Sequence, residues 1–296
     1  MHVSDILNRD KTIFSFEFFP PKSDDGWSAL SNRLHDFEAM EPSFVSVTYG
    51  AGGSSRERTH ELVCHLATNT SLDPIPHLTC VGHTQKEIES LLHAYSEAKV
   101  DNILALRGDQ PISGTTGGDF QHAVDLLDAI KKFSDASFGI GVAGFPEGHP
   151  ETPNRLVQMD HLKAKVDRGA DWICTQLFFD NRAYLDWLER CDLAGIQTPT
   201  IAGIMPITSL SSMRRMAELA GGANFPAPLL RRLHRFQDDP QSVRQAGISW
   251  AAEQCADLLD HGVRGIHFYT MNQSSATEEI YRSLGAPKGS MLRNNT

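Results

Sequence analysis

Hydrophobic residues along the chain gather in eight short runs rich in β-branched and aromatic residues, and most of the intervening stretches have helical spacing. The runs cover residues 13–19, 44–49, 75–80, 102–108, 138–145, 172–179, 200–206 and 265–270. Apolar residues over 27–37 recur at the spacing of an amphipathic helix. Thr84 followed by Glu87 predicts a capping box that opens a helix over 85–97.

The order of these elements predicts the fold. Continuous apolar runs are typical of parallel strands buried on both faces. Eight strand–helix units in 296 residues, with no linker between them, predict one (β/α)8 TIM barrel over 1–296. A doubly wound parallel sheet is the alternative. Residues 224–236 are expected to add a helix around the barrel mouth, and residues 285–296 to form a frayed polar tail.

Composition narrows the class of partner. The net charge is −10 and no block of Lys and Arg stands out, which argues against nucleic acid and anionic membranes. The N-terminus has no signal-peptide pattern, and no apolar run reaches the roughly 18 residues of a membrane span. The five cysteines never occur as CxxC, so we expect reduced, mostly buried thiols in a cytoplasmic protein.

GIGVAG at 139–144 matches the GxGxxG pattern of dinucleotide-binding folds. That mechanism needs a helix directly after the glycines, so that its amides meet a pyrophosphate. Pro146 and Pro150 disfavour such a helix. We therefore interpret these glycines as part of a barrel strand.

HELVCH at 60–65 resembles a zinc-protease motif, but its histidines are five residues apart. Residues at i and i+5 do not share a helix face, whereas i and i+4 do. The remaining histidines are dispersed, and the sequence predicts no metal site.

Polar residues fall at the carboxyl ends of the predicted strands, where barrel enzymes carry their chemistry. They are Glu17, Thr48, His77, Arg107 with Asp109, Gln176, and Tyr269 with Thr270. This arrangement predicts one convergent pocket. Glu17 stands out because it lies in FSFEFFPPK, where aromatic surroundings would raise its pKa unless a polar ligand meets it.

The strand ends resemble those of the methylenetetrahydrofolate reductase family. The matching segments, in chain order, are FSFEFFPPK, FVSVTYGAGG, PHLTC, ALRGD, FPEGHPE, TQLFFD and HFYTMN. The resemblance implies a barrel that binds FAD non-covalently at its carboxyl face. NADH or NADPH would reduce the flavin, and 5,10-methylenetetrahydrofolate would then be reduced to 5-methyltetrahydrofolate in a ping-pong scheme. It also implies a role in one-carbon metabolism and assembly as a homo-oligomer. The implied form of the enzyme is the catalytic barrel without the carboxyl-terminal regulatory domain of eukaryotic relatives.

The resemblance also implies roles for single residues. Glu17 would be the general acid, Asp109 would act beside the flavin and pterin, and Gln176 and Gln273 would contact the folate. The FAD-binding positions would be Thr48, His77, Arg107, Gly108, Asp109, Phe120, Ala143, Phe145, His149, His161 and Lys165. For His77, His149 and Gln176 a purely structural role stays open.

Some positions depart from the family pattern. After HFYT the family usually has Leu-Asn-Arg, whereas this chain has Met271, Asn272 and Gln273. Gln158, His161 and Ala164 stand where bacterial relatives often have Asp, Asn and Arg, which leaves the choice between NADH and NADPH open. Two other functions remain as alternatives: a flavin barrel similar to proline dehydrogenase, and a folate- or flavin-binding protein without turnover.

Overall fold

The computed structural model describes residues 1–49, 56–108, 118–219 and 223–293. Eight parallel strands pair in chain order, and β8 pairs back onto β1, so the sheet closes into a barrel. The strands are β1 (Ile13–Phe18), β2 (Phe44–Val47), β3 (Pro74–Thr79), β4 (Asn102–Leu106), β5 (Gly139–Gly144), β6 (Trp172–Thr175), β7 (Thr200–Ile204) and β8 (Gly265–Tyr269). The predicted barrel is confirmed, and the doubly wound alternative is wrong.

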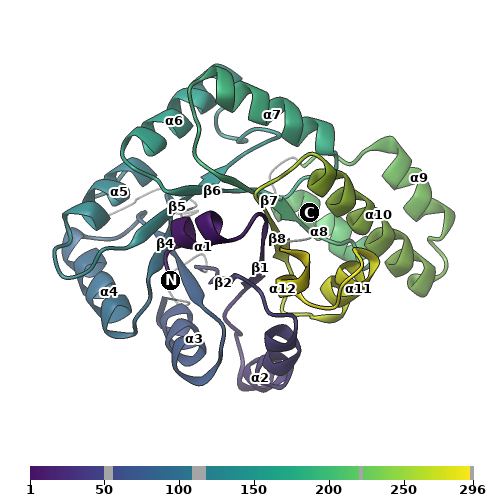
Figure 1. Ribbon diagram of the computed structural model, residues 1–296, viewed down its shortest axis with the longest axis horizontal. Coiled ribbons are helices and arrows are strands. Elements are labelled where there is room, and N and C mark those ends of the chain that lie inside the picture. The colour runs from purple at the N-terminus through teal and green to yellow at the C-terminus, as the bar shows by residue number, and fades with distance from the viewer. Residues whose placement is uncertain (50–55, 109–117, 220–222, 294–296) are drawn as a thin grey trace.

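Helices surround the barrel on all sides (Figure 1). They are α1 (Val3–Arg9), α2 (Asp24–Ala39), α3 (Arg56–Asn69), α4 (Gln85–Glu97), α5 (Ala123–Lys132), α6 (Arg155–Asp167), α7 (Asn181–Leu193), α8 (Leu210–Leu219), α9 (Ala227–Arg235), α10 (Pro240–Asp260), α11 (Ser275–Ser283) and α12 (Gly289–Leu292). The predicted capping box of α4 is confirmed, since Thr84 and Glu87 exchange both hydrogen bonds. The extra helix is α9, which lies beyond α10 at the outer edge of the molecule.

The phenylalanines of β1 point away from the barrel axis. Phe18 packs on Phe37 of α2, with ring centroids 4.7 Å apart, and Phe14 packs on Tyr281 of α11 at 5.5 Å. Side chains alternate between the two faces of a strand, so Glu17 points inward. The expectation that phenylalanines shelter Glu17 is therefore wrong: they belong to the layer between sheet and helices.

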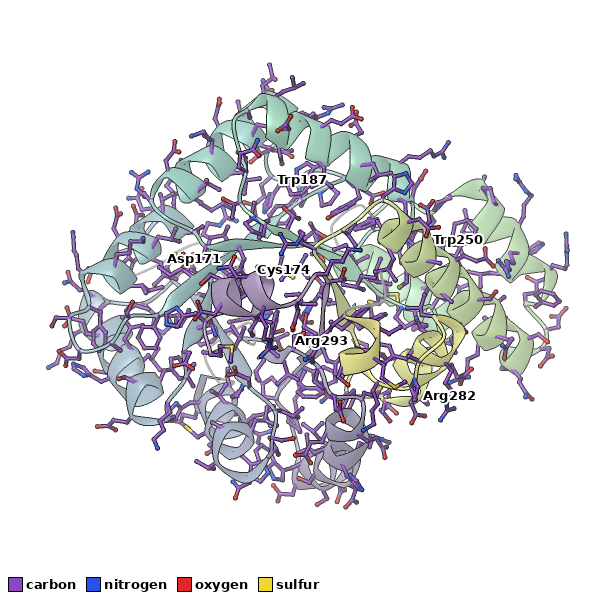
Figure 2. All side chains as sticks on the ribbon, viewed as in Figure 1. Asp171, Cys174, Trp187, Trp250, Arg282 and Arg293 are labelled. Atoms are coloured by element: carbon purple, nitrogen blue, oxygen red, sulfur yellow. The ribbon has the colours of Figure 1, made fainter. Side chains whose placement is uncertain are left out.

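Helix α1 closes the amino end of the barrel. Its apolar face packs on inward-facing residues of the strands, namely Ile13, Phe44, Ile75, Leu104, Trp172, Cys174 and Ile201. Asn102 holds the helix in place: its Oδ1 accepts from the Val3 amide at 2.9 Å, and its Nδ2 donates to the Met1 carbonyl at 2.7 Å. Figure 2 shows Cys174 near the centre of the ring of strands, beside α1. The barrel floor is apolar and sealed.

Two of the three glycines of GIGVAG make room inside this floor. All three lie in β5, which confirms the interpretation as a barrel strand. A Cβ on Gly141 would lie 2.2 Å from the Trp172 ring, and one on Gly139 would lie 2.4 Å from Asn102 Oδ1. The spacing reflects packing and not a phosphate loop.

The two histidines of HELVCH contact different neighbours. His60 packs on Tyr95 of α4 with ring centroids 5.6 Å apart, while His65 packs on Trp27 of α2 at 5.5 Å. Because α2 and α4 flank α3 on opposite sides, the prediction that these histidines do not share a face is confirmed.

Residues 285–293 are held against the rest of the molecule, so the expectation of a frayed tail is wrong for them. The Gly289 amide donates to the Met40 carbonyl at 2.7 Å, and Leu292 is 3% exposed. One buried leucine and the backbone contacts of α12 outweigh the polar composition. Residues 294–296 lie outside the described residues.

Other expectations concern thiols and membranes. All five cysteines are free and four are buried, as predicted. Within the described ranges, no helix combines the length and apolar character that a membrane crossing requires.

Gly141→Ala should destabilise the protein by about 1–3 kcal/mol, because the added methyl overlaps the Trp172 ring. Urea unfolding measures this loss. Adding Trp172→Leu should recover part of it, so the double variant should lose less than the two single variants summed. Strict additivity would show that the two side chains do not share this space.

Candidate active site

Glu17 ends β1 with its carboxyl group between two imidazole rings. Its Oε2 lies 3.7 Å from Nε2 of His77 on β3 and 4.0 Å from Nε2 of His267 on β8. The Glu17 side chain is 19% exposed, whereas both rings are buried. These distances exceed those of hydrogen bonds. The structure thus brings two of the predicted site residues, Glu17 and His77, together at the carboxyl end of the barrel.

The charge states of this cluster follow from burial. Loss of water raises the pKa of Glu17 from its usual 4.5 to about 8, and lowers the pKa of His77 and of His267 to about 3. Near neutral pH the carboxyl is therefore largely protonated and both rings are neutral. The three groups lie within ion-pair distance, but they do not form an ion pair. The expectation of a raised pKa is confirmed, with the barrel interior as its cause.

His267 was not among the predicted site residues, yet it is the better anchored of the two rings. Ser15 Oγ lies 2.8 Å from its Nδ1, and Ser46 Oγ lies 3.3 Å from its Nε2. The available signal was the two-residue period of strands: Ser15 with Glu17, and His267 with Tyr269, occupy the same inward face. By contrast, Nε2 of the buried His77 has no hydrogen-bond partner among the described residues.

The segments that follow β1 and β8 are tied together beside Glu17. Thr270 Oγ1 donates to the Glu17 carbonyl at 2.6 Å. Asn272 accepts from the Phe19 amide at 3.0 Å and donates to the Phe19 carbonyl at 2.9 Å. Met271 and Asn272 have φ angles of 51° and 56°, a left-handed conformation that non-glycine residues adopt at a cost. This backbone fixes the strand end that carries the acid.

Basic and small residues lie at the ends of β4 and β5. Lys165 of α6 donates to the Ala143 carbonyl at 2.7 Å, and burial lowers its pKa to about 8. Gly108 has a φ of 87°, and a Cβ there would lie 2.9 Å from the Thr79 side chain. Arg107 pairs with Glu151 at 2.5 Å and lowers the pKa of that carboxyl.

The other predicted residues vary in their surroundings. The Thr48 amide donates to the Phe18 carbonyl at 2.8 Å, and Phe120 is buried in the core. Gln176 Oε1 accepts from the Leu177 amide at 2.9 Å, which supports the structural alternative for that oxygen.

His149 lies in the loop after β5. Its Nδ1 accepts from the Glu151 amide at 3.2 Å, and its ring packs edge-on against Phe145. These contacts support the turn-stabilising alternative for this histidine. His161 and Gln273 are exposed, and Asp109 lies outside the described residues.

A closed parallel barrel with a partly exposed acid and two buried histidines at the carboxyl ends of its strands has the arrangement of (β/α)8-barrel enzymes. The chain belongs to the methylenetetrahydrofolate reductase family: the family model of that description matches residues 2–285. The resemblance noted in the strand ends is thereby confirmed.

Individual relatives carry names of the same family. The chain is 35% identical over 275 residues to 5,10-methylenetetrahydrofolate reductase of Escherichia coli, covering 93% of this chain and 91% of that protein. It is 39% identical over 282 residues to methylenetetrahydrofolate reductase 1 of Schizosaccharomyces pombe, covering 94% of this chain and 46% of the relative. The chain therefore spans about half the length of the yeast relative, and likewise 50% of the Arabidopsis thaliana NADH-type relative.

Solved structures share the fold at low identity. An uncharacterised protein from Clostridium thermocellum, described as binding two copies of 5-methyl-5,6,7,8-tetrahydrofolic acid, superposes with a TM-score of 0.68 at 13% identity. That match covers 95% of this chain and 96% of the other. The tryptophan synthase α-subunit of Pyrococcus furiosus gives 0.52 at 11% identity, covering 93% and 98%.

Glu17 should make stability fall as the pH rises. Between its ordinary pKa of 4.5 and its folded pKa of about 8, the folded protein holds a proton that the unfolded chain has released. This contribution is complete below 4.5 and is lost as the pH rises through 8. The unfolding free energy of the wild type minus that of Glu17→Gln should therefore fall as the pH rises, by at most about 1.4 kcal/mol per unit.

Urea unfolding from about pH 5 to about pH 8 measures this slope. The histidines act in the opposite sense, since their stability contribution is lost as the pH falls below 6.5, and they cancel in the comparison. Glu61→Gln, on the exposed face of α3, is the matched control and should leave the slope unchanged. If the difference between wild type and Glu17→Gln did not change with pH, the carboxyl would not be protonated in the folded protein.

Proposed function

We propose that this protein reduces 5,10-methylenetetrahydrofolate to 5-methyltetrahydrofolate, with NADH or NADPH as the reductant and FAD as the bound carrier, in a ping-pong scheme. The observation that carries the proposal is the neutral Glu17 carboxyl at the carboxyl end of a barrel whose sequence belongs to this family. The family supplies the substrate class, and the acid supplies the chemistry that this substrate needs.

The methylene carbon of the substrate is held in a five-membered ring between two nitrogens. Before that carbon accepts hydride, one carbon–nitrogen bond must break, and its electron pair stays on the departing nitrogen. Glu17 gives its proton to that nitrogen: the carboxyl O–H bond breaks, an N–H bond forms, and the other nitrogen becomes an iminium. An acid whose pKa of about 8 lies near the working pH suits this step.

The residues at the ends of β4 and β5 fit a dinucleotide with a diphosphate. FAD, when bound, supplies the two-electron exchange between nicotinamide and folate. Lys165 is a half-buried cation whose hydrogen bond goes to a neutral carbonyl, so its charge is available to a phosphate. Gly108 lets the backbone come close to a ligand. Arg107 can serve the same anion by exchanging Glu151 for it.

Further contacts to the substrate remain part of the proposal. Among the described residues Gln176 forms a side-chain hydrogen bond through its oxygen alone, to the Leu177 amide, which leaves its amide NH2 for a pterin edge. Asp109, through its negative charge, would disfavour the anionic reduced flavin and so favour hydride donation. Gln273, in place of the usual arginine, would contact the folate without charge.

Anaerobic titration of the purified protein tests the proposed function. The protein should be yellow, lose its colour with NADH or NADPH, and regain it with methylenetetrahydrofolate. Bleaching by proline instead would favour the proline-dehydrogenase alternative. Tight folate binding without recovery of colour would favour the non-catalytic alternative.

Glu17→Gln should separate the two half-reactions. Reduction by nicotinamide needs no proton from this side chain and should keep its rate within about threefold. Reoxidation by the folate should fall by a factor of about 100 or more, since 100 is the lower end of the usual contribution of general-acid catalysis. Anaerobic stopped-flow absorbance measures both steps, and Glu61→Gln is the control. An equal fall in both half-reactions would refute the general-acid assignment.

Lys165→Met should weaken FAD binding about tenfold or more, because it removes a charged hydrogen-bond donor from the phosphate region. Quenching of flavin fluorescence measures the dissociation constant. Lys163→Met is the matched control on the same helix, since Lys163 pairs with Asp167. Equal effects of the two substitutions would assign Lys165 a role in the helix instead.

A further inference from the structure

We propose that His267, clamped between Ser15 and Ser46, is a positioning residue that shields the Glu17 carboxyl from water on the side of the barrel floor and keeps it in its neutral, proton-donating form. The catalytic meaning of this inference rests on the proposed function. The inference itself concerns the state of one carboxyl group and can be tested without turnover.

Four contacts fix the His267 ring. Ser15 Oγ meets Nδ1 at 2.8 Å, and Ser46 Oγ meets Nε2 at 3.3 Å. The Phe44 ring lies nearly parallel at 6.2 Å, and the Tyr269 ring stands nearly perpendicular at 5.4 Å. With 1% exposure the ring has no room to turn, so Nε2 stays 4.0 Å from Glu17 Oε2.

The strand register explains why this contact is specific. Ser15 is the partner of His267 across the β1–β8 pair, and Glu17 is the partner of Ser46 across the β1–β2 pair. The clamp therefore joins three neighbouring strands directly beneath the acid. A ring in this place fills the space between the carboxyl and the apolar floor, and it keeps water away from the carboxyl from below.

The titratable groups that face Glu17 from the described elements are all uncharged near neutral pH. They are His77 from β3, Cys174 from β6, and His267 with Tyr269 from β8. Burial lowers the pKa of both histidines and raises the pKa of Cys174 and of Tyr269. Without a neighbouring cation, exclusion of water decides the state of the carboxyl. His267 is the residue beneath it that excludes water.

The unfolding free energy stops falling with pH once the pH exceeds the folded-state pKa of Glu17, and this pH is the upper limit of the Glu17 titration. His267→Asn should lower this limit by about one pH unit or more, which is a tenfold change in the ionisation constant. The shorter side chain leaves space for water, which stabilises the carboxylate. The measurement is the pH dependence of unfolding free energy, compared between His267→Asn and His267→Asn/Glu17→Gln. A merely structural role would lower stability equally at every pH and leave this limit in place.

Ser15→Ala provides a second variant that frees the ring without removing it, and it should shift the limit in the same direction by a smaller amount. His83→Asn is the matched control: this histidine is equally buried but bonds Tyr49. If neither His267→Asn nor Ser15→Ala moves the limit, the proposal is overturned.

The pH profile of folate-driven reoxidation separates this inference from the proposed function. Its apparent pKa should fall together with the stability limit. A shifted limit in a protein that never reduces the folate would uphold the positioning role and refute the function. Normal folate reduction with an unshifted limit would uphold the proposed function and refute the positioning role of His267.

Discussion

A mostly buried carboxylic acid, with no cation beside it among the described residues, is the constraint on which this site depends. Ionising Glu17 in the barrel interior would cost free energy that no described neighbour returns, so the group holds its proton. The same burial keeps His77 and His267 neutral. The Nε2 atoms of His77 and His267 lie 3.7 and 4.0 Å from Glu17 Oε2. Neither ring nor the carboxyl is charged near neutral pH.

The barrel achieves this by dividing its interior into layers. Helix α1 and the inward apolar side chains form a floor that excludes water from the amino end. Serines, histidines and the acid occupy the layer above. Small residues make this stacking feasible: a Cβ on Gly203 would lie 2.4 Å from the Thr175 carbonyl oxygen and 2.8 Å from the Tyr269 ring, and one on Gly141 would overlap Trp172. Glycine is therefore needed where a neighbouring backbone or a large side chain comes this close.

Most of the fold was readable from the sequence, because buried parallel strands leave continuous apolar runs and each run began close to an observed strand. Glu17 and His77 were found as polar residues at strand ends. His267 was missed because a histidine next to a phenylalanine looks ordinary until its strand is paired with Ser15. The prediction that the phenylalanines of β1 surround Glu17 is wrong for a related reason. Neighbours in a strand point to opposite faces of the sheet, so closeness in sequence does not place these rings beside the carboxyl. The Arg107–Glu151 pair joins residues 44 positions apart, and local patterns do not encode such contacts.

The acid lies on the seam where the first strand meets the last. Glu17 comes from β1, but the ring beneath it comes from β8, more than 200 residues later in the chain. The first seven strands alone would contain the glutamate but not the imidazole ring beneath it. The surroundings of the acid are therefore complete only when β8 pairs with β1.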